Sequence, residues 1–135
     1  PRRACLLLCA CMLARQEALM ARKDIVGRTG EQIAVDHLTA AGYRIIDRNW
    51  RCSVGEVDVI AERGGTTVFV EVKTRSGRGY GHPLEAITAI KLARLRRLAA
   101  AWCADNGPVS RIRIDAIAVI TAPGQTLVEH VEQVA

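Results

Sequence analysis

The segment from Gly55 to Arg75, GEVDVIAERGGTTVFVEVKTR, predicts a β-hairpin around which the rest of the chain is interpreted. Its two halves, Glu56–Glu62 and Thr66–Lys73, are rich in Val, Ile, Phe and Thr, which favour strands. Gly64 and Gly65 join the halves, and a glycine pair suits a two-residue hairpin turn. We therefore expect an antiparallel pair of strands.

This hairpin would carry charged side chains inside an apolar run. With a symmetric turn, Asp58 lies opposite Glu71 and Glu56 opposite Lys73. Because side chains alternate along a strand, these four share one face, and the other face holds Val57, Val59, Val70 and Val72. Directly opposed carboxylates repel. Either a divalent cation such as Mg²⁺ or Mn²⁺ binds between them, or the charges neutralise one another as a cross-strand ion-pair cluster.

A helix is predicted upstream of the hairpin, beginning at Gly27 and ending at Gly42. Thr29 can cap it, and its apolar positions recur at helical spacing. Glu31 lies in the first turn, where an acidic side chain interacts favourably with the positive end of the helix dipole. That stabilising role is one interpretation of Glu31, and a contribution to a metal site is the other.

The remaining pattern predicts an α/β fold with a mixed sheet. Arg113 and Asp115 share one side of a late strand and are able to pair. The expected elements are a strand at Tyr43–Asn49, a connection at Trp50–Val54, a helix at Leu84–Asn106, a strand at Arg111–Thr121 and an edge strand at Leu127–Val134.

The charge balance favours a polyanionic partner. The chain has 19 Lys and Arg against 14 Asp and Glu, a net charge of +5. The loop Thr74–Pro83 is glycine-rich and basic, so it is either a nucleic-acid contact or an ordinary connection. Lys91, Arg94 and Arg97 recur at three-residue steps on the predicted helix, which indicates either a phosphate-binding face or a solvated one.

Residues 1–24 do not follow the pattern of the domain expected at residues 25–135. Arg2 and Arg3 precede a short apolar run, Ala4–Ala14, that is too short to span a bilayer. We favour an over-extended or appended leader over a secretory signal peptide. A metal site at Cys5, Cys9 and Cys11 would lack the further ligands that it needs. The five cysteines indicate reduced thiols in a cytoplasmic protein without a membrane segment.

Asp58, followed after 12 intervening residues by Glu71-Val72-Lys73, resembles the PD-(D/E)xK signature of restriction-endonuclease-like nucleases. A wider set of motifs resembles the YraN-type family of small bacterial endonuclease-like proteins. The resemblance runs from about Ile25 to the C-terminus, and it implies an α/β fold of the restriction-endonuclease type, with a mixed central sheet flanked by helices. The motifs are Gly30-Glu31, Ala41-Gly42-Tyr43, Arg48-Asn49, Gly55-Glu56-x-Asp58, Val70-Glu71-Val72-Lys73-x-Arg75 and Arg113-x-Asp115.

The resemblance also implies residue roles. Catalysis would use Glu31, Asp58, Glu71 and Lys73. Mg²⁺ or Mn²⁺ would be held by Asp58, Glu71, Glu31 and the Val72 carbonyl. Glu56 and Glu85 would contact these ligands and not the ion itself. Nucleic acid would contact Arg28, Arg75, Arg78, Lys91 and Arg94.

The expected function is metal-dependent hydrolysis of phosphodiester bonds in branched or single-stranded DNA. RNA is the alternative substrate. A homodimer is one possible oligomeric state. A second hypothesis is a non-catalytic nucleic-acid-binding accessory protein that retains the nuclease fold. A third is a purely structural or protein-interaction module.

Overall fold

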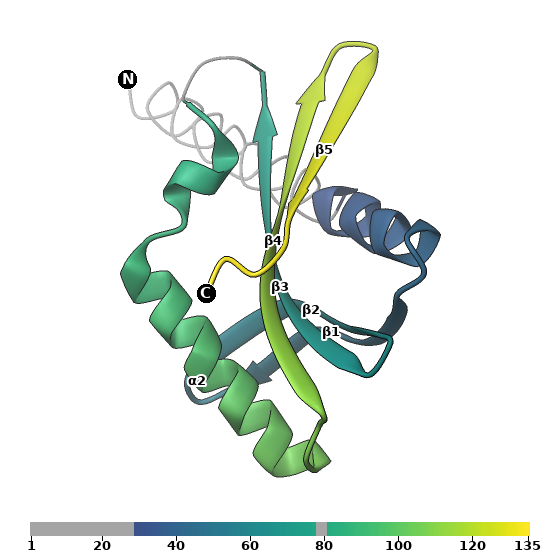
Figure 1. Ribbon diagram of the computed structural model, residues 1–135. Coiled ribbons are helices and arrows are strands. Elements are labelled where there is room, and N and C mark those ends of the chain that lie inside the picture. The colour runs from purple at the N-terminus through teal and green to yellow at the C-terminus, as the bar shows by residue number, and fades with distance from the viewer. Residues whose placement is uncertain (1–28, 78–80) are drawn as a thin grey trace, which may run out of the picture.

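The computed structural model describes residues 29–77 and 81–135, so the predicted leader and the predicted helix start at Gly27 lie outside the described residues. Within the described part, five strands form one sheet in the order β1-β2-β3-β4-β5 (Figure 1). The strands β3 and β4 pair in parallel, and the other neighbours pair antiparallel. The bounds are β1 Arg44–Cys52, β2 Gly55–Arg63, β3 Thr66–Ser76, β4 Arg111–Ala122 and β5 Gln125–Val131. The predicted mixed-sheet α/β fold is confirmed, and it is consistent with the restriction-endonuclease-like class.

The predicted hairpin forms in the expected register. Paired residues run from Arg63↔Thr66 to Val59↔Val70, and both turn glycines have positive φ, 57° at Gly64 and 80° at Gly65. Backbone pairing ends at Val59↔Val70, so the two pairs expected beyond it, Asp58–Glu71 and Glu56–Lys73, are not cross-strand pairs.

Helices cover the two faces of the sheet (Figure 1). The helix at residues 29–40 covers one face, where Leu38 packs with Val59 and Val70. The helix α2 (Ala89–Asn106) covers the other, where Leu98 packs with Val57. The prediction that Val57 shares a face with Val59 and Val70 is therefore wrong. The change falls where β2 leaves β3 and where Asn49 of the neighbouring strand β1 has a positive φ, so the strict alternation of a regular ladder is not kept there.

The helix predicted at Leu84–Asn106 is two elements. A 3₁₀ helix, η1 (Pro83–Ala86), is followed by an extended residue, Ile87, and α2 starts after Thr88. The Thr88 hydroxyl accepts a hydrogen bond from Lys91 N at 3.3 Å, so Thr88 caps α2 and separates it from η1.

The first strand is longer than predicted, and the last is shorter. The strand β1 continues through Trp50, which pairs with Val57, so the connection expected at Trp50–Val54 is reduced to a two-residue turn. The strand β5 lies at a sheet edge, as predicted. Arg113 and Asp115 form the predicted ion pair, at 2.8 Å.

Among the described residues, no helix is both long enough and apolar enough to cross a membrane. Among these residues, Cys52 and Cys103 are free thiols.

Candidate metal centre

Three carboxylates from two elements converge beside the start of β2. Glu31 comes from the helix at residues 29–40, and Glu56 and Asp58 come from β2. Each offers one oxygen, and these oxygens all lie within 4.8 Å of one another. All three side chains are partly buried. The donor set consists entirely of carboxylate oxygens, the ligands that hard divalent cations prefer.

Gly30 explains how Glu31 reaches this position. Gly30 is buried, and a Cβ built on it would lie 1.9 Å from the Thr74 hydroxyl oxygen. The first turn of the helix therefore approaches β3 more closely than any other residue type would permit. The Gly30-Glu31 motif thus combines a close helix–strand contact with the acidic side chain that follows it.

Asp58 lies where the β2–β3 ladder ends. Its carboxylate accepts a hydrogen bond from the Val72 N–H at 2.8 Å. A side-chain carboxylate thus takes a backbone N–H just beyond the last pair, Val59↔Val70. This bond fixes the Asp58 side chain next to the first residues of the Glu71-Val72-Lys73 motif.

The surroundings of Asp58 disfavour its negative charge. Burial raises its pKa most, the neighbouring charges of Glu71, Glu31 and Glu56 raise it further, and the Val72 N–H opposes them; the result is a pKa of about 7. A bound cation would remove this conflict, because its positive charge would offset three acidic groups at once.

Glu71 and Lys73 form an ion pair within β3. The Lys73 Nζ lies 3.1 Å from Glu71 Oε1. Glu56 is paired as well, with Arg51 Nε at 2.7 Å. The ion-pair interpretation expected the hairpin charges to neutralise one another across the two strands. Glu71 instead pairs within its own strand, and the partner of Glu56 is on β1. Asp58 is held by a backbone N–H. Glu71 affects the pKa of Asp58, although it lies outside the group of three converging oxygens.

Asn49 is a residue to which the sequence analysis assigned no role. Oriented with its amide nitrogen toward the carboxylates, its side chain donates to Glu56 Oε1 and Glu31 Oε2, each at 3.1 Å. The Arg48-Asn49 motif was a sequence signal, but it carried no information about which groups Asn49 would contact.

Comparison with known proteins supplies the family. The sequence profile of the "Uncharacterised protein family UPF0102" matches residues 30–119. The chain belongs to this family. It is 58% identical to a UPF0102 protein of Leifsonia xyli subsp. xyli over 104 residues, which cover 76% of this chain and 88% of the relative. It is 50% identical to one of Arthrobacter sp. over 117 residues, or 85% of this chain and 99% of the relative.

The match to UPF0102 begins at Gly30 and ends at Val119 within β4, so it includes every residue of the acidic group. This agrees with the YraN-type resemblance noted in the sequence. The family description does not state an activity, and the function is therefore argued from the site.

The basic residues predicted to contact nucleic acid differ in their exposure and in their hydrogen-bond partners. Arg94 is exposed, and its Cδ lies 3.7 Å from the Cβ position at Gly55, the residue before Glu56. Lys91 donates from Nζ to the Ala86 carbonyl at 2.9 Å. Arg75 is exposed near the end of β3. The predicted contacts Arg28 and Arg78 lie outside the described residues.

Glu85 is exposed in η1, where its carboxylate approaches Gly81, and the structure does not bring it into the acidic group. The carbonyl of Val72 was expected to serve as a ligand, whereas the contact that ties Val72 to the site is made by its N–H.

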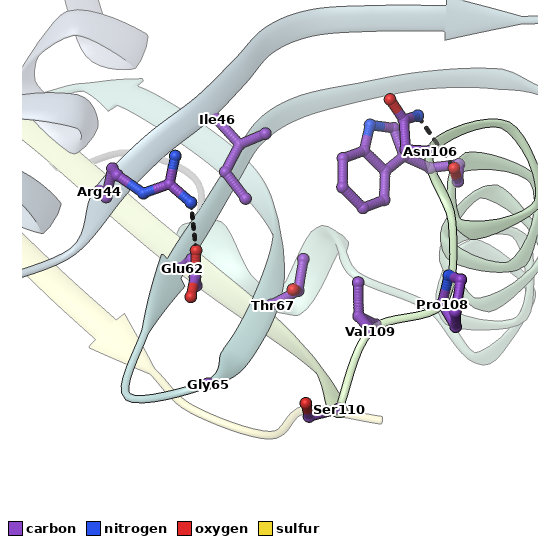
Figure 2. A pocket seen from close by; sticks show the side chains of 10 residues that line it. Arg44, Ile46, Glu62, Gly65, Thr67, Asn106, Pro108, Val109 and Ser110 are labelled. Atoms are coloured by element: carbon purple, nitrogen blue, oxygen red, sulfur yellow. Dashed lines mark hydrogen bonds and ion pairs between the residues drawn. The ribbon is translucent and has the colours of Figure 1, made fainter.

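A pocket of about 420 Å³ lies at the other end of the hairpin (Figure 2). Residues from the sheet, the C-terminal turn of α2 and the segment before β4 line it. The ion pair between Arg44 and Glu62 lies on its sheet side. Since Glu62 is four positions along β2 from Asp58, roughly 13 Å at strand spacing, this pocket and the acidic group are separate features of the same sheet.

Proposed function

We propose that this UPF0102 protein is a metal-dependent nuclease that hydrolyses phosphodiester bonds. The convergence of Glu31, Glu56 and Asp58 carries the proposal. Three partly buried carboxylates so close together favour a bound cation. The pKa of about 7 at Asp58, raised most by burial and further by its acidic neighbours, supports this. Such acidic groups, beside a lysine, suit phosphoryl chemistry.

The donor chemistry favours Mg²⁺ or Mn²⁺, both of which prefer carboxylate, carbonyl and water ligands. Glu31, Glu56 and Asp58 would hold the ion. Glu71, which raises the pKa of Asp58, would add a further negative charge close to the ion. When bound, the ion supplies Lewis acidity toward a phosphate oxygen and lowers the pKa of a coordinated water.

Lys73 would act on the substrate. Its ammonium group is held beside Glu71 at 3.1 Å on the strand that also carries Val72. A positioned positive charge there stabilises the negative charge that develops on the phosphate during hydrolysis. Asp58 is oriented by the Val72 N–H.

DNA is the substrate we favour, in single-stranded or branched form, with RNA as the other candidate. The net charge of +5 attracts a polyanion, and the exposed Arg94 lies beside Gly55, the residue that precedes Glu56. Phosphate contacts of this kind position a backbone without reading bases, which fits a small domain that recognises shape.

The test is cleavage of labelled single-stranded, duplex and branched DNA, and of RNA, with Mg²⁺, Mn²⁺ or a chelator. Asp58→Asn and Lys73→Met are compared with the parent and with Glu62→Gln, an acid on the same strand that pairs with Arg44 at the far end of the hairpin. We expect cleavage that requires the metal, falls at least about a hundredfold in both site variants and persists in Glu62→Gln.

The non-catalytic accessory role is the competing proposal, favoured by the exposed arginines Arg94, Arg96 and Arg97 of α2. It predicts intact substrates and salt-sensitive binding that is equal in the parent, Asp58→Asn and Lys73→Met proteins. That combination would replace the nuclease proposal with the accessory one.

A further inference from the structure

Asn49 interrupts the regular backbone of β1. Its φ is 52°, in the left-handed region that asparagine tolerates better than most residues. It lies between the pairs Arg48↔Val59 and Trp50↔Val57, which places it beside Asp58 in the neighbouring strand. A strand residue in this conformation turns its side chain in a direction that a regular strand would not allow.

The Asn49 carboxamide links the two elements that supply the acidic group. With its nitrogen facing the carboxylates, it donates to Glu31 Oε2 on the helix and to Glu56 Oε1 on β2, each at 3.1 Å. A primary amide has two N–H donors, so one side chain serves both carboxylates at once. In the opposite orientation, its oxygen would face only acceptor oxygens.

We infer that Asn49 is a positioning residue of the cation site: its amide holds the Glu31 and Glu56 carboxylates at a fixed spacing before the cation binds. This inference rests on the proposed metal site. Without the amide, two like-charged side chains on separate elements separate, and the cation then has to bring them back together. Groups that orient metal ligands through hydrogen bonds typically account for 10- to 100-fold in metal affinity.

Two merely structural roles compete with this assignment. Asn49 could serve only to allow the left-handed backbone. It could also serve only to dock the helix, as the adjacent Arg48 does through a hydrogen bond from Nη1 to Gln32 Oε1 at 3.0 Å. A useful variant must therefore remove the amide and retain the backbone conformation.

Asn49→Gly meets that requirement, because glycine adopts positive φ readily. The measurement is the dissociation constant for Mn²⁺ and for Mg²⁺ by titration calorimetry on the full chain, with the melting temperature recorded in chelator. We expect Asn49→Gly to weaken cation binding 10- to 100-fold.

Two controls separate the alternatives. Gln133→Gly removes an amide side chain from the other non-glycine residue with positive φ among the described residues, φ 54°, away from the acidic group. Arg48→Ala removes the neighbouring helix contact. Both should keep the dissociation constant within about threefold of the parent value.

The outcomes are distinct. A parent protein that binds neither cation overturns the proposed function and this inference together. A parent that binds, with an Asn49→Gly variant that is folded in chelator and binds equally well, overturns the inference alone. An equal loss in Arg48→Ala assigns the effect to helix docking and also overturns it. If Asn49→Gly is unfolded in chelator, the amide is needed to hold the helix in the metal-free fold, and the positioning assignment is overturned.

Discussion

Asp58 is subject to opposing influences at a single carboxyl group. The Val72 N–H favours its charged form, while burial and three neighbouring carboxylates favour the protonated one. The second set dominates, so the pKa is about 7 rather than near 4. At this residue a proton and a metal ion therefore compete for the same group.

We predict that cation affinity rises with pH up to about 7 and then levels off. Below its pKa of about 7, Asp58 must release a proton before it binds a cation, so the affinity should fall about tenfold for each pH unit. Titration calorimetry with Mn²⁺ at several values between pH 5.5 and 8.5 measures this, and two buffers of different ionisation enthalpy count the protons released. Affinity independent of pH across this range would contradict the prediction.

The same pKa has an effect of opposite sign on the metal-free fold. Because the pKa of Asp58 is higher in the folded chain than the ordinary 3.8, its contribution to stability is fully present below that value and is lost as the pH rises through about 7. Adding a divalent cation above pH 7 should restore this stability, and melting temperatures measured with and without chelator detect it.

Residue types and spacing were enough to indicate acidic candidates at this site, but their neighbours were not predictable. The contact that Asn49 makes depends on a left-handed backbone and on side chains from two other elements. Similarly, the position of Glu56 among the converging oxygens depends on β2 leaving its regular pairing beyond Val59. Short-range patterns contain neither piece of information.

At the scale of elements, the contact between the first helix and β3 positions Glu31. We predict that Gly30→Ala destabilises the protein by about 1–3 kcal/mol, because a Cβ would overlap the Thr74 hydroxyl. It should also weaken cation binding, since the helix has to move away from β3. Urea denaturation and calorimetry measure the two effects.

A double variant provides the control for this contact. Thr74→Ala removes the hydroxyl that the new methyl group would meet, so Gly30→Ala should cost less in the Thr74→Ala background than in the parent. Additive free energies would show that the overlap is not the cause.

The helix α2 carries an exposed arginine, Arg94, beside Gly55, the residue that precedes Glu56. We predict that Arg94→Ala weakens DNA binding and lowers the slope of log K against log salt by about one, as expected for one lost phosphate contact. Arg44→Ala is the matched control, because Arg44 is engaged with Glu62 beside the separate pocket. Equal slopes for the Arg94→Ala variant and the parent would rule out this contact.

The hairpin was the most predictable element because two glycines at adjacent positions set both the turn and the register. The boundary between η1 and α2 was harder to predict from the sequence. Leu84 and Ile87 continue the apolar spacing of α2, and only the Thr88 cap, confirmed by its bond from Lys91 N, reveals the break. Periodicity identifies a buried stripe, whereas capping decides where a helix starts.

For the whole molecule, a second polar network joins β4, β5 and the residues that follow the first helix. Asp115 is fully buried, and it accepts hydrogen bonds from Arg113 at 2.8 Å and from the Gln133 N–H at 3.0 Å. His130 lies 2.7 Å away, and Arg113 also bonds the Tyr43 hydroxyl. The Arg113-x-Asp115 motif therefore ties three separate parts of the chain together.

We predict that Asp115→Ala lowers the free energy of unfolding by about 3–5 kcal/mol, because it leaves the largely buried Arg113 without its main partner. Urea denaturation at pH 7 measures this. Glu132→Ala is the control: Glu132 lies 3.7 Å from Arg113 and is half exposed, so its loss should cost less than about 0.5 kcal/mol.

The pH dependence of this network has a definite sign. Burial alone would raise the pKa of Asp115, but the hydrogen bonds from His130, Arg113 and the Gln133 N–H outweigh it and lower the pKa. The stability that Asp115 provides is therefore present above the ordinary carboxyl pKa of 3.8 and is lost as the pH falls through the lowered value. Asp115→Asn should lose less stability on acidification than the parent does, and urea midpoints at pH 7 and pH 3 compare them.

The left-handed backbone at Asn49 has one more consequence. The strand β1 is at the edge of the sheet, where an unbroken row of unpaired N–H and C=O groups would recruit the strand of another molecule. Asn49, together with the irregularity between Ile45 and Asp47, breaks that row at two places. The distortion that brings an amide to the carboxylates thus also protects the protein against edge-to-edge aggregation.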